Sequence, residues 1–199
     1  NLGAGTHGGR RLGLFQAGAE GRFDYWFSLN RQQADNDFQY ENRPEWFNPG
    51  DGAESRRRNA DITHNDASAR VGYRLSPDRR LDALLQWTDK DQGIPSLQNW
   101  EANQARLETR QQRVQFHYQD SGWWDGRLQS SHRLLLGRRQ HTYLDRVGRI
   151  GTGVHDARDQ TDQFGFNNSL TWLLGAHRLS AGLDARLYRL DQEDRLQAE

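Results

Sequence analysis

Apolar side chains recur at every second position in several stretches of roughly ten residues, and turn-forming residues separate these stretches. The clearest case lies at 164–187, where apolar residues alternate on both sides of a short turn at 174–177. Strict alternation gives an extended strand one apolar and one polar face. Short and long connectors alternate between the stretches, which is typical of the wall of a transmembrane β-barrel.

The pattern predicts where each strand begins and ends. We expect a strand stub at 2–5, strands at 10–19, 22–33, 62–75, 80–89, 105–118 and 127–142, and a final hairpin around the turn at 174–177. Long loops are expected at 34–61, 90–104 and 143–160, and a short turn containing Trp123 and Trp124 at 119–126. The predicted fold is therefore all-β, an antiparallel up-and-down sheet of about eight strands plus the stub.

Composition narrows the alternatives. Only 34% of the 199 residues are hydrophobic, and no stretch approaches the roughly 20 apolar residues that a membrane-spanning helix needs. The formal net charge is zero, so we expect no nucleic-acid partner. Cysteine is absent, which leaves no disulfide, thiolate or zinc–thiolate chemistry. Methionine is also absent, and we expect a processed product or, in preference, a piece of a longer polypeptide.

Tyrosine and tryptophan lie near the predicted strand ends. The residues concerned are Trp87, Tyr118, Trp123, Trp124, Tyr143, Trp172 and Tyr188. This distribution predicts aromatic girdles at two membrane interfaces. The alternative is that aromatic side chains simply favour strands.

Six short motifs follow one another along the chain: GRFDYWFSL at 21–29, DNDF at 35–38, RRNAD at 57–61, GYRL at 72–75, DKDQGIP at 89–95 and the pair Thr109-Arg110. In this order and spacing they resemble the early barrel of TonB-dependent outer-membrane receptors. The resemblance implies a 22-stranded barrel closed by an N-terminal plug. The chain then corresponds to the end of the first barrel strand through about the ninth, and residues 1–199 form one partial barrel domain without its plug.

The resemblance also implies a location and partners. The short turns are expected to be periplasmic and the long loops extracellular, in a multi-pass barrel of the bacterial outer membrane. The implied partners are membrane lipid, lipopolysaccharide, a metal-chelate ligand, and a TonB-type energy-transducing protein that acts through the missing plug. The implied activity is energy-dependent uptake of an iron–siderophore, haem, cobalamin or a similar scarce chelate, without a cofactor or covalent chemistry.

Candidate ligand-binding residues lie in the long loops. An anionic aromatic chelate could be held by Trp46, Phe47, Arg56, Arg57, Arg58 and Trp100. Arginine suits this role because its planar guanidinium forms forked hydrogen bonds and stacks on rings. The alternative is that the arginine run is a solvated loop or binds lipopolysaccharide phosphates.

The metal-site candidates are fewer. Asp35 and Asp37 have the spacing of calcium ligands, although an Asx-rich turn is the interpretation we prefer. His141 and His155 share one predicted loop and could hold a metal ion or haem.

No nucleophile elbow, phosphate loop or HExxH motif is present in the sequence, and we do not expect an enzyme. Two other functions remain open. The first is a soluble or secreted β-sheet binding module of the adhesin kind, and the second is a passive porin.

Overall fold

The chain forms a single nine-stranded antiparallel sheet in the order β1-β2-β3-β6-β7-β8-β9-β10-β11, together with a separate two-stranded β4-β5 sheet. It is described from a computed structural model that covers residues 1–41, 54–96, 103–148, 150 and 153–196. No helix occurs in these residues. The prediction of an all-β, antiparallel, up-and-down sheet of eight strands and a stub is confirmed.

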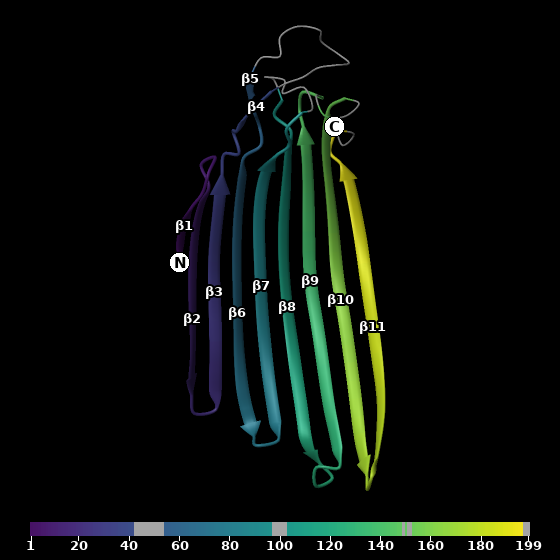
Figure 1. Cartoon of the computed structure of the whole chain (residues 1–199). Helices are drawn as coiled ribbons and strands as arrows, with labels where there is room; N and C mark the ends of the chain where they lie inside the picture. Colours follow the sequence, from purple (N-terminus) through teal and green to yellow (C-terminus); the bar gives the residue numbers. More distant parts are fainter. Residues whose placement is uncertain (42–53, 97–102, 149, 151–152, 197–199) are drawn as a thin grey trace.

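The large sheet contains β1 (Leu2–Ala4), β2 (Arg10–Glu20), β3 (Phe23–Ala34), β6 (Ile62–Ser76), β7 (Arg79–Gly93), β8 (Arg106–Trp123), β9 (Leu128–Asp145), β10 (His155–Leu174) and β11 (His177–Asp194). The small sheet contains β4 (Gln39–Glu41) and β5 (Glu54–Arg56). Neighbouring strands of the large sheet lie side by side, with the short turns at one end and the long connections at the other (Figure 1).

The strands reach further than the apolar alternation predicted. β7 continues to Gly93, β9 continues to Asp145, and β10 begins at His155, so parts of the predicted loops at 90–104 and 143–160 are strand. Trp123 ends β8 instead of lying in a turn. The reason is that backbone pairing does not require apolar side chains: β10 and β11 stay in register up to Ala157 and Asp194.

The first long connection also differs from its prediction, because part of it is the β4-β5 hairpin. Gln39 pairs with Arg56, and Glu41 pairs with Glu54. Each of these strands has only three residues, too few for an alternation to be recognised in the sequence.

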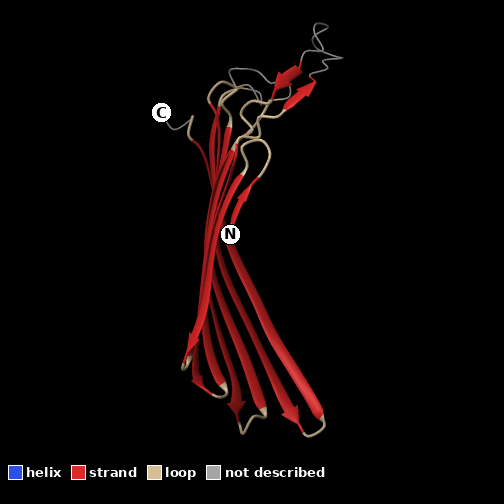
Figure 2. Cartoon of the chain, turned by 60° about the vertical axis from the view of Figure 1, so that its left-hand side comes forward, coloured by secondary structure: helices blue, strands red, loops and turns tan. Residues whose placement is uncertain are grey.

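The sheet is a single open layer (Figure 2). Within the described residues β11 pairs with β10 alone and β1 with β2 alone, so the sheet is not closed into a barrel. The chain by itself is therefore not a 22-stranded barrel. Among the described residues Ala105 is the one buried apolar side chain, so the sheet has no hydrophobic core of its own.

One face of the sheet carries a continuous apolar band. From β3 to β11, residues directly opposite one another form two uninterrupted apolar rows: Phe27, Ala69, Leu85, Val114, Leu136, Phe164 and Leu187, and next to it Tyr25, Val71, Ala83, Phe116, Leu134, Phe166 and Ala185. In β2 these rows continue with Gln16 and Gly18. We call this side the apolar face and the opposite side the polar face. The larger of these side chains are extensively exposed, for example Leu85 at 51% and Leu187 at 68%.

The band runs obliquely across the strands. The next row toward the long connections is apolar at Leu29 and Trp87, yet the same row is charged at Arg138 and Asp162. Toward the short turns, the next row is apolar or aromatic from Phe23 to Tyr118 but is interrupted by His132 and Asn168, which are hydrogen-bonded to each other at 2.6 Å. Beyond that row β10 is apolar again at Leu170 and Trp172. The border toward the long connections is thus the oblique one. The strands are therefore inclined to the apolar band, as they are in a barrel wall.

The predicted aromatic girdle residues divide between the two faces. Trp87, Tyr118 and Trp172 share the apolar face by register. Trp124 lies in the β8–β9 turn, with its ring centroid 5.6 Å from that of Trp172. Tyr143 and Tyr188 lie on the polar face, which contradicts the girdle prediction for these two residues. Tyr188 lies within β11 and not at its end.

No described residue belongs to a helix of the length and apolarity that crossing a membrane requires.

Candidate functional site

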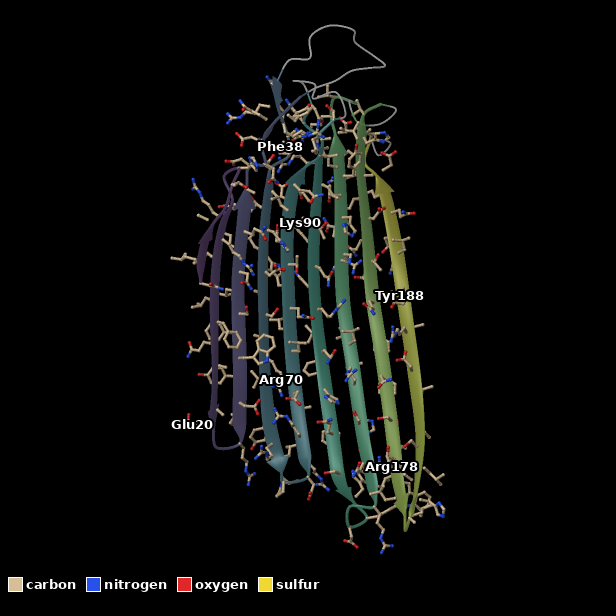
Figure 3. The ribbon with its side chains drawn as sticks, in the orientation of Figure 1. Glu20, Phe38, Arg70, Lys90, Arg178 and Tyr188 are labelled. Carbon is tan, nitrogen blue, oxygen red and sulfur yellow. The ribbon has the colours of Figure 1, made fainter. Side chains whose placement is uncertain are left out.

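The polar face of β3, β6 and β7 is organised by a four-residue ion network of Asp24, Arg70, Arg80 and Asp82. Arg80 Nη2 donates to Asp24 Oδ2 at 2.7 Å, and Arg80 Nε donates to both Asp82 carboxylate oxygens at 3.0 Å. Arg70 donates to the same two carboxylates. Every charge in this ion network has an opposite charge beside it, which makes it self-neutralising. Figure 3 labels Arg70 in the short-turn half of the sheet and Lys90 nearer the long connections.

Gly72 makes room for this ion network. It lies directly between Asp24 and Asp82 in register. A Cβ at this position would overlap Arg80 Nη2 and would lie 2.8 Å from Asp24 Oδ1. Only a residue without a side chain leaves the guanidinium of Arg80 space to cross the middle strand, so Gly72 is part of the ion network's construction.

The polar face of β8–β11 is built differently. A hollow of about 320 Å³ lies between Arg113, Arg133, Gln163, Asn167 and Arg186, with Gly165 among its lining residues. We call this set the arginine hollow. Arg186 Nε is 3.1 Å from Asp184 Oδ1, and Asn167 Nδ2 donates to the same carboxylate at 3.2 Å. The side chain of Asp184 is thus already engaged.

Two arginines of the hollow remain without a counter-charge. In the part of the chain that the structure describes, Arg113 and Arg133 take part in no ion pair or side-chain hydrogen bond. Arg113 is half-buried and Arg133 is exposed. The hollow therefore carries three arginines against one aspartate, in contrast to the balanced ion network on the neighbouring strands.

The long-connection end is held together by polar contacts at the base of its loops. Asn59 Nδ2 donates to the carbonyl oxygens of Ile94 and Ala105, at 3.1 and 2.8 Å. Arg106 bridges Asp61 and Asp91, with nitrogen–oxygen distances of 2.9 Å. Burial acts to lower the pKa of Arg106, but the hydrogen bonds to Asp91 and Asp61 outweigh it and raise that pKa above its ordinary value. The first and second long connections thus share one fixed base.

The predicted ligand-binding arginines lie above this base, on or just after β5. Arg56 Nε is 3.3 Å from Asp37 Oδ2, and the guanidinium of Arg57 lies 5.6 Å from the ring centroid of Tyr40. Arg58 follows and is exposed. Arg56 and Arg57 therefore help to hold the β4-β5 hairpin. Trp46, Phe47 and Trp100 lie outside the described residues, so the grouping that the sequence proposed stays a prediction.

The structure does not bring the predicted calcium ligands together. The Asp37 carboxylate pairs with Arg56, while the Asp35 carboxylate packs against Gly8, where a Cβ would overlap it. The backbone N–H groups of Asp35 and Asn36 both donate to the carbonyl oxygen of His7 at 3.1 Å. These contacts involve the backbone of Asp35 and Asn36, and the Asx-rich turn stays a prediction.

The two candidate histidines are also apart. His141 lies in β9 and His155 in β10, so they do not share a loop. His155 is opposite Asp145, four residues along β9 from His141, which separates the two by about 13 Å along the strand. His141 Nδ1 is 3.0 Å from Thr109 Oγ1, and the ring centroids of His155 and Tyr143 are 6.0 Å apart. Among the described residues no cluster of three or more His, Cys, Asp or Glu side chains could hold a metal ion.

Comparison with known proteins adds no assignment. No protein-family model matches the chain, and a search of curated proteins gave no match. The resemblance to outer-membrane receptors therefore rests on the sequence motifs alone.

Both features of the polar face were missed by sequence reasoning. The alternation does place Asp24 and Arg80 on the polar face, but they are 56 residues apart, and the sequence alone does not give the strand register. The unpaired arginines were hidden in the general excess of arginine along the chain.

Proposed function

We propose that this chain forms part of the wall of a bacterial outer-membrane receptor of the TonB-dependent class. The receptor takes up a metal chelate such as an iron–siderophore, haem or cobalamin. The apolar face contacts lipid, the polar face lines the lumen, the short turns are periplasmic and the long connections are extracellular. Lipopolysaccharide surrounds the extracellular end, and a TonB-type protein supplies energy through a plug domain.

The oblique apolar band is the observation that carries this proposal. It spans two rows of the sheet from β3 to β11 and leaves large side chains such as Leu85 exposed, while no apolar core lies on either side of the described sheet. An apolar surface of this extent needs cover, because soluble proteins rarely expose a continuous apolar patch of more than a few hundred square ångströms. Lipid provides such cover for an antiparallel sheet whose strands alternate between apolar and polar residues.

The open edges support membership in a larger wall. β11 runs for 18 residues with hydrogen-bonded partners on one side only. Unpaired backbone groups are not tolerated in the hydrocarbon region of a membrane, so further strands must continue the sheet there. The motifs described above favour the TonB-dependent class for that wall, and the long connections with their fixed base provide a place for ligand capture.

Two neighbouring leucines of β9 allow a matched test in the full-length protein. Leu136 lies on the apolar face and Leu135 on the polar face. Leu136→Arg is expected to lower the free energy of unfolding in lipid vesicles by about 2–4 kcal/mol, because it places a charge in hydrocarbon. Leu135→Arg introduces the same charge on the other face and is expected to cost less than about 1 kcal/mol.

Equal effects of the two leucine substitutions contradict the assignment of the faces. Cell fractionation tests the location directly: recovery of the full-length protein as a water-soluble monomer without detergent excludes a membrane wall and favours the binding-module alternative.

The transport step is tested with a strain in which the gene is deleted. The strain is supplied with one chelate at a time under iron limitation, and cobalamin is tested in a cobalamin auxotroph that carries the same deletion. We expect growth on one chelate to be lost and to be restored by the gene. Unchanged growth on every chelate contradicts the uptake activity.

A further inference from the structure

We propose that the arginine hollow binds a small solute that carries two oxyanion groups, either phosphates or carboxylates. This inference goes beyond the proposed receptor function. It rests on the side chains that share the polar face of β8–β11 in the described residues.

The charge balance of the hollow is the first argument. Arg113 and Arg133 have no carboxylate partner in the described residues, whereas Arg70 and Arg80 on the same face are each paired twice. Arg186 already forms an ion pair with Asp184, the acidic residue of the hollow. The guanidiniums of Arg113 and Arg133 therefore offer ten N–H donors in total without a charged acceptor. An oxyanion supplies that acceptor.

The geometry of the hollow is the second argument. Arg113 is directly opposite Gly137, and Arg133 lies four residues further along β9, so the two arginines flank the hollow from positions about 13 Å apart along the strand. Between them lie Gln115 and the small residue Gly165, which is buried. Because arginine side chains are long and flexible, the two guanidiniums can converge from opposite ends of the hollow on one solute, each on its own oxyanion group.

The polar lining is the third argument. The amide side chains of Gln115, Gln163 and Asn167 border the same hollow. Asn167 already donates to Asp184 and Gln163 to Tyr188, but each side-chain amide has two N–H donors, so one on each remains for oxygens that the arginines do not reach. Arginine forms forked, bidentate hydrogen bonds with phosphate and carboxylate, which gives the site geometric selectivity as well as charge.

Pyrophosphate is the probe for the test, and orthophosphate is its single-group comparison. Binding to the full-length protein in non-ionic detergent is measured by isothermal titration calorimetry at low and moderate salt. We expect pyrophosphate to bind about tenfold more tightly than orthophosphate, since two arginines contact it. Arg113→Gln and Arg133→Gln are each expected to remove that advantage, so that pyrophosphate binds only as weakly as orthophosphate.

Arg138→Gln is the matched control. It removes the same charge from β9. Arg138, however, lies on the apolar face, in the same register row as Leu29, and it pairs with Asp162. Pyrophosphate affinity is expected to stay unchanged in this variant. The same loss in Arg138→Gln as in Arg133→Gln would show a general charge effect and overturn the site, as would absence of pyrophosphate binding to the parent protein.

Fractionation of the same variants separates the two proposals. A parent protein that resides in the outer membrane and does not bind pyrophosphate overturns the anion site and leaves the receptor wall standing. Arginine-dependent binding by a protein that never enters the membrane supports the anion site and contradicts the receptor wall.

Discussion

The two halves of the polar face use the same residue types in opposite ways. On β3, β6 and β7, Arg70 and Arg80 are neutralised by two aspartates of neighbouring strands. On β8–β11, Arg113 and Arg133 have no such partners among the described residues. A closed ion network holds strands together and has no capacity left for a ligand. An unbalanced cluster contributes little to the sheet and keeps its hydrogen-bonding capacity for another molecule.

Among the changes that test this contrast between the two halves, the largest effect is expected from breaking the ion network. Asp82→Asn removes the carboxylate that both Arg70 and Arg80 contact, and leaves their charges close together. The Asp82 side chain is 12% exposed, so solvent screens the remaining charges only partly. We expect the free energy of unfolding to fall by about 2–3 kcal/mol, measured by denaturant titration of the full-length protein in vesicles. A change below about 0.5 kcal/mol contradicts a stabilising role for the ion network.

A smaller effect is expected from filling the space that the ion network occupies. Gly72→Ala forces the Arg80 guanidinium aside and is expected to cost about 1–2 kcal/mol in the same titration. Gly137→Ala is the matched control on the other half of the face, because the nearest atom to its added Cβ lies 3.6 Å away, an ordinary contact. A similar loss of unfolding free energy at both positions would show that the strand backbone requires glycine at Gly72, independently of the ion network.

The smallest expected effect on stability belongs to the arginine hollow. Arg113→Gln removes a charge that has no described partner, so the free energy of unfolding is expected to change by less than about 0.5 kcal/mol. The same variant loses the tighter binding of pyrophosphate. A large loss of stability in Arg113→Gln contradicts the contrast between the two halves, because it shows that Arg113 is held by the fold.

The sequence predicts the strands of this sheet well where one face is apolar. The first strand was expected at 10–19 and β2 spans Arg10–Glu20; the third was expected at 62–75 and β6 spans Ile62–Ser76. Prediction was poorer toward the long connections, where both faces become polar and the alternation ends before the backbone pairing does. β10 therefore begins at His155, inside a predicted loop.

The polar-face sites were less predictable than the strands. Their members come from several strands, so they depend on a register that no local pattern encodes. The phase of the alternation does assign Arg113 and Arg133 to the polar face. Whether an aspartate stands opposite an arginine, as Asp24 and Asp82 do around Gly72, is known only once the strands are aligned.

The oblique course of the apolar band has a consequence for the dimensions of the wall. From β3 to β10 the long-connection border of the band moves by about two residues, or about 7 Å, over five strand spacings of about 4.8 Å. These lengths correspond to strands that lean by about 15° from the normal of the band. In a closed wall of a given number of strands, a greater lean gives a wider lumen. In the proposed receptor wall, the slope of this border therefore relates the side-chain pattern of each strand to the width of the lumen.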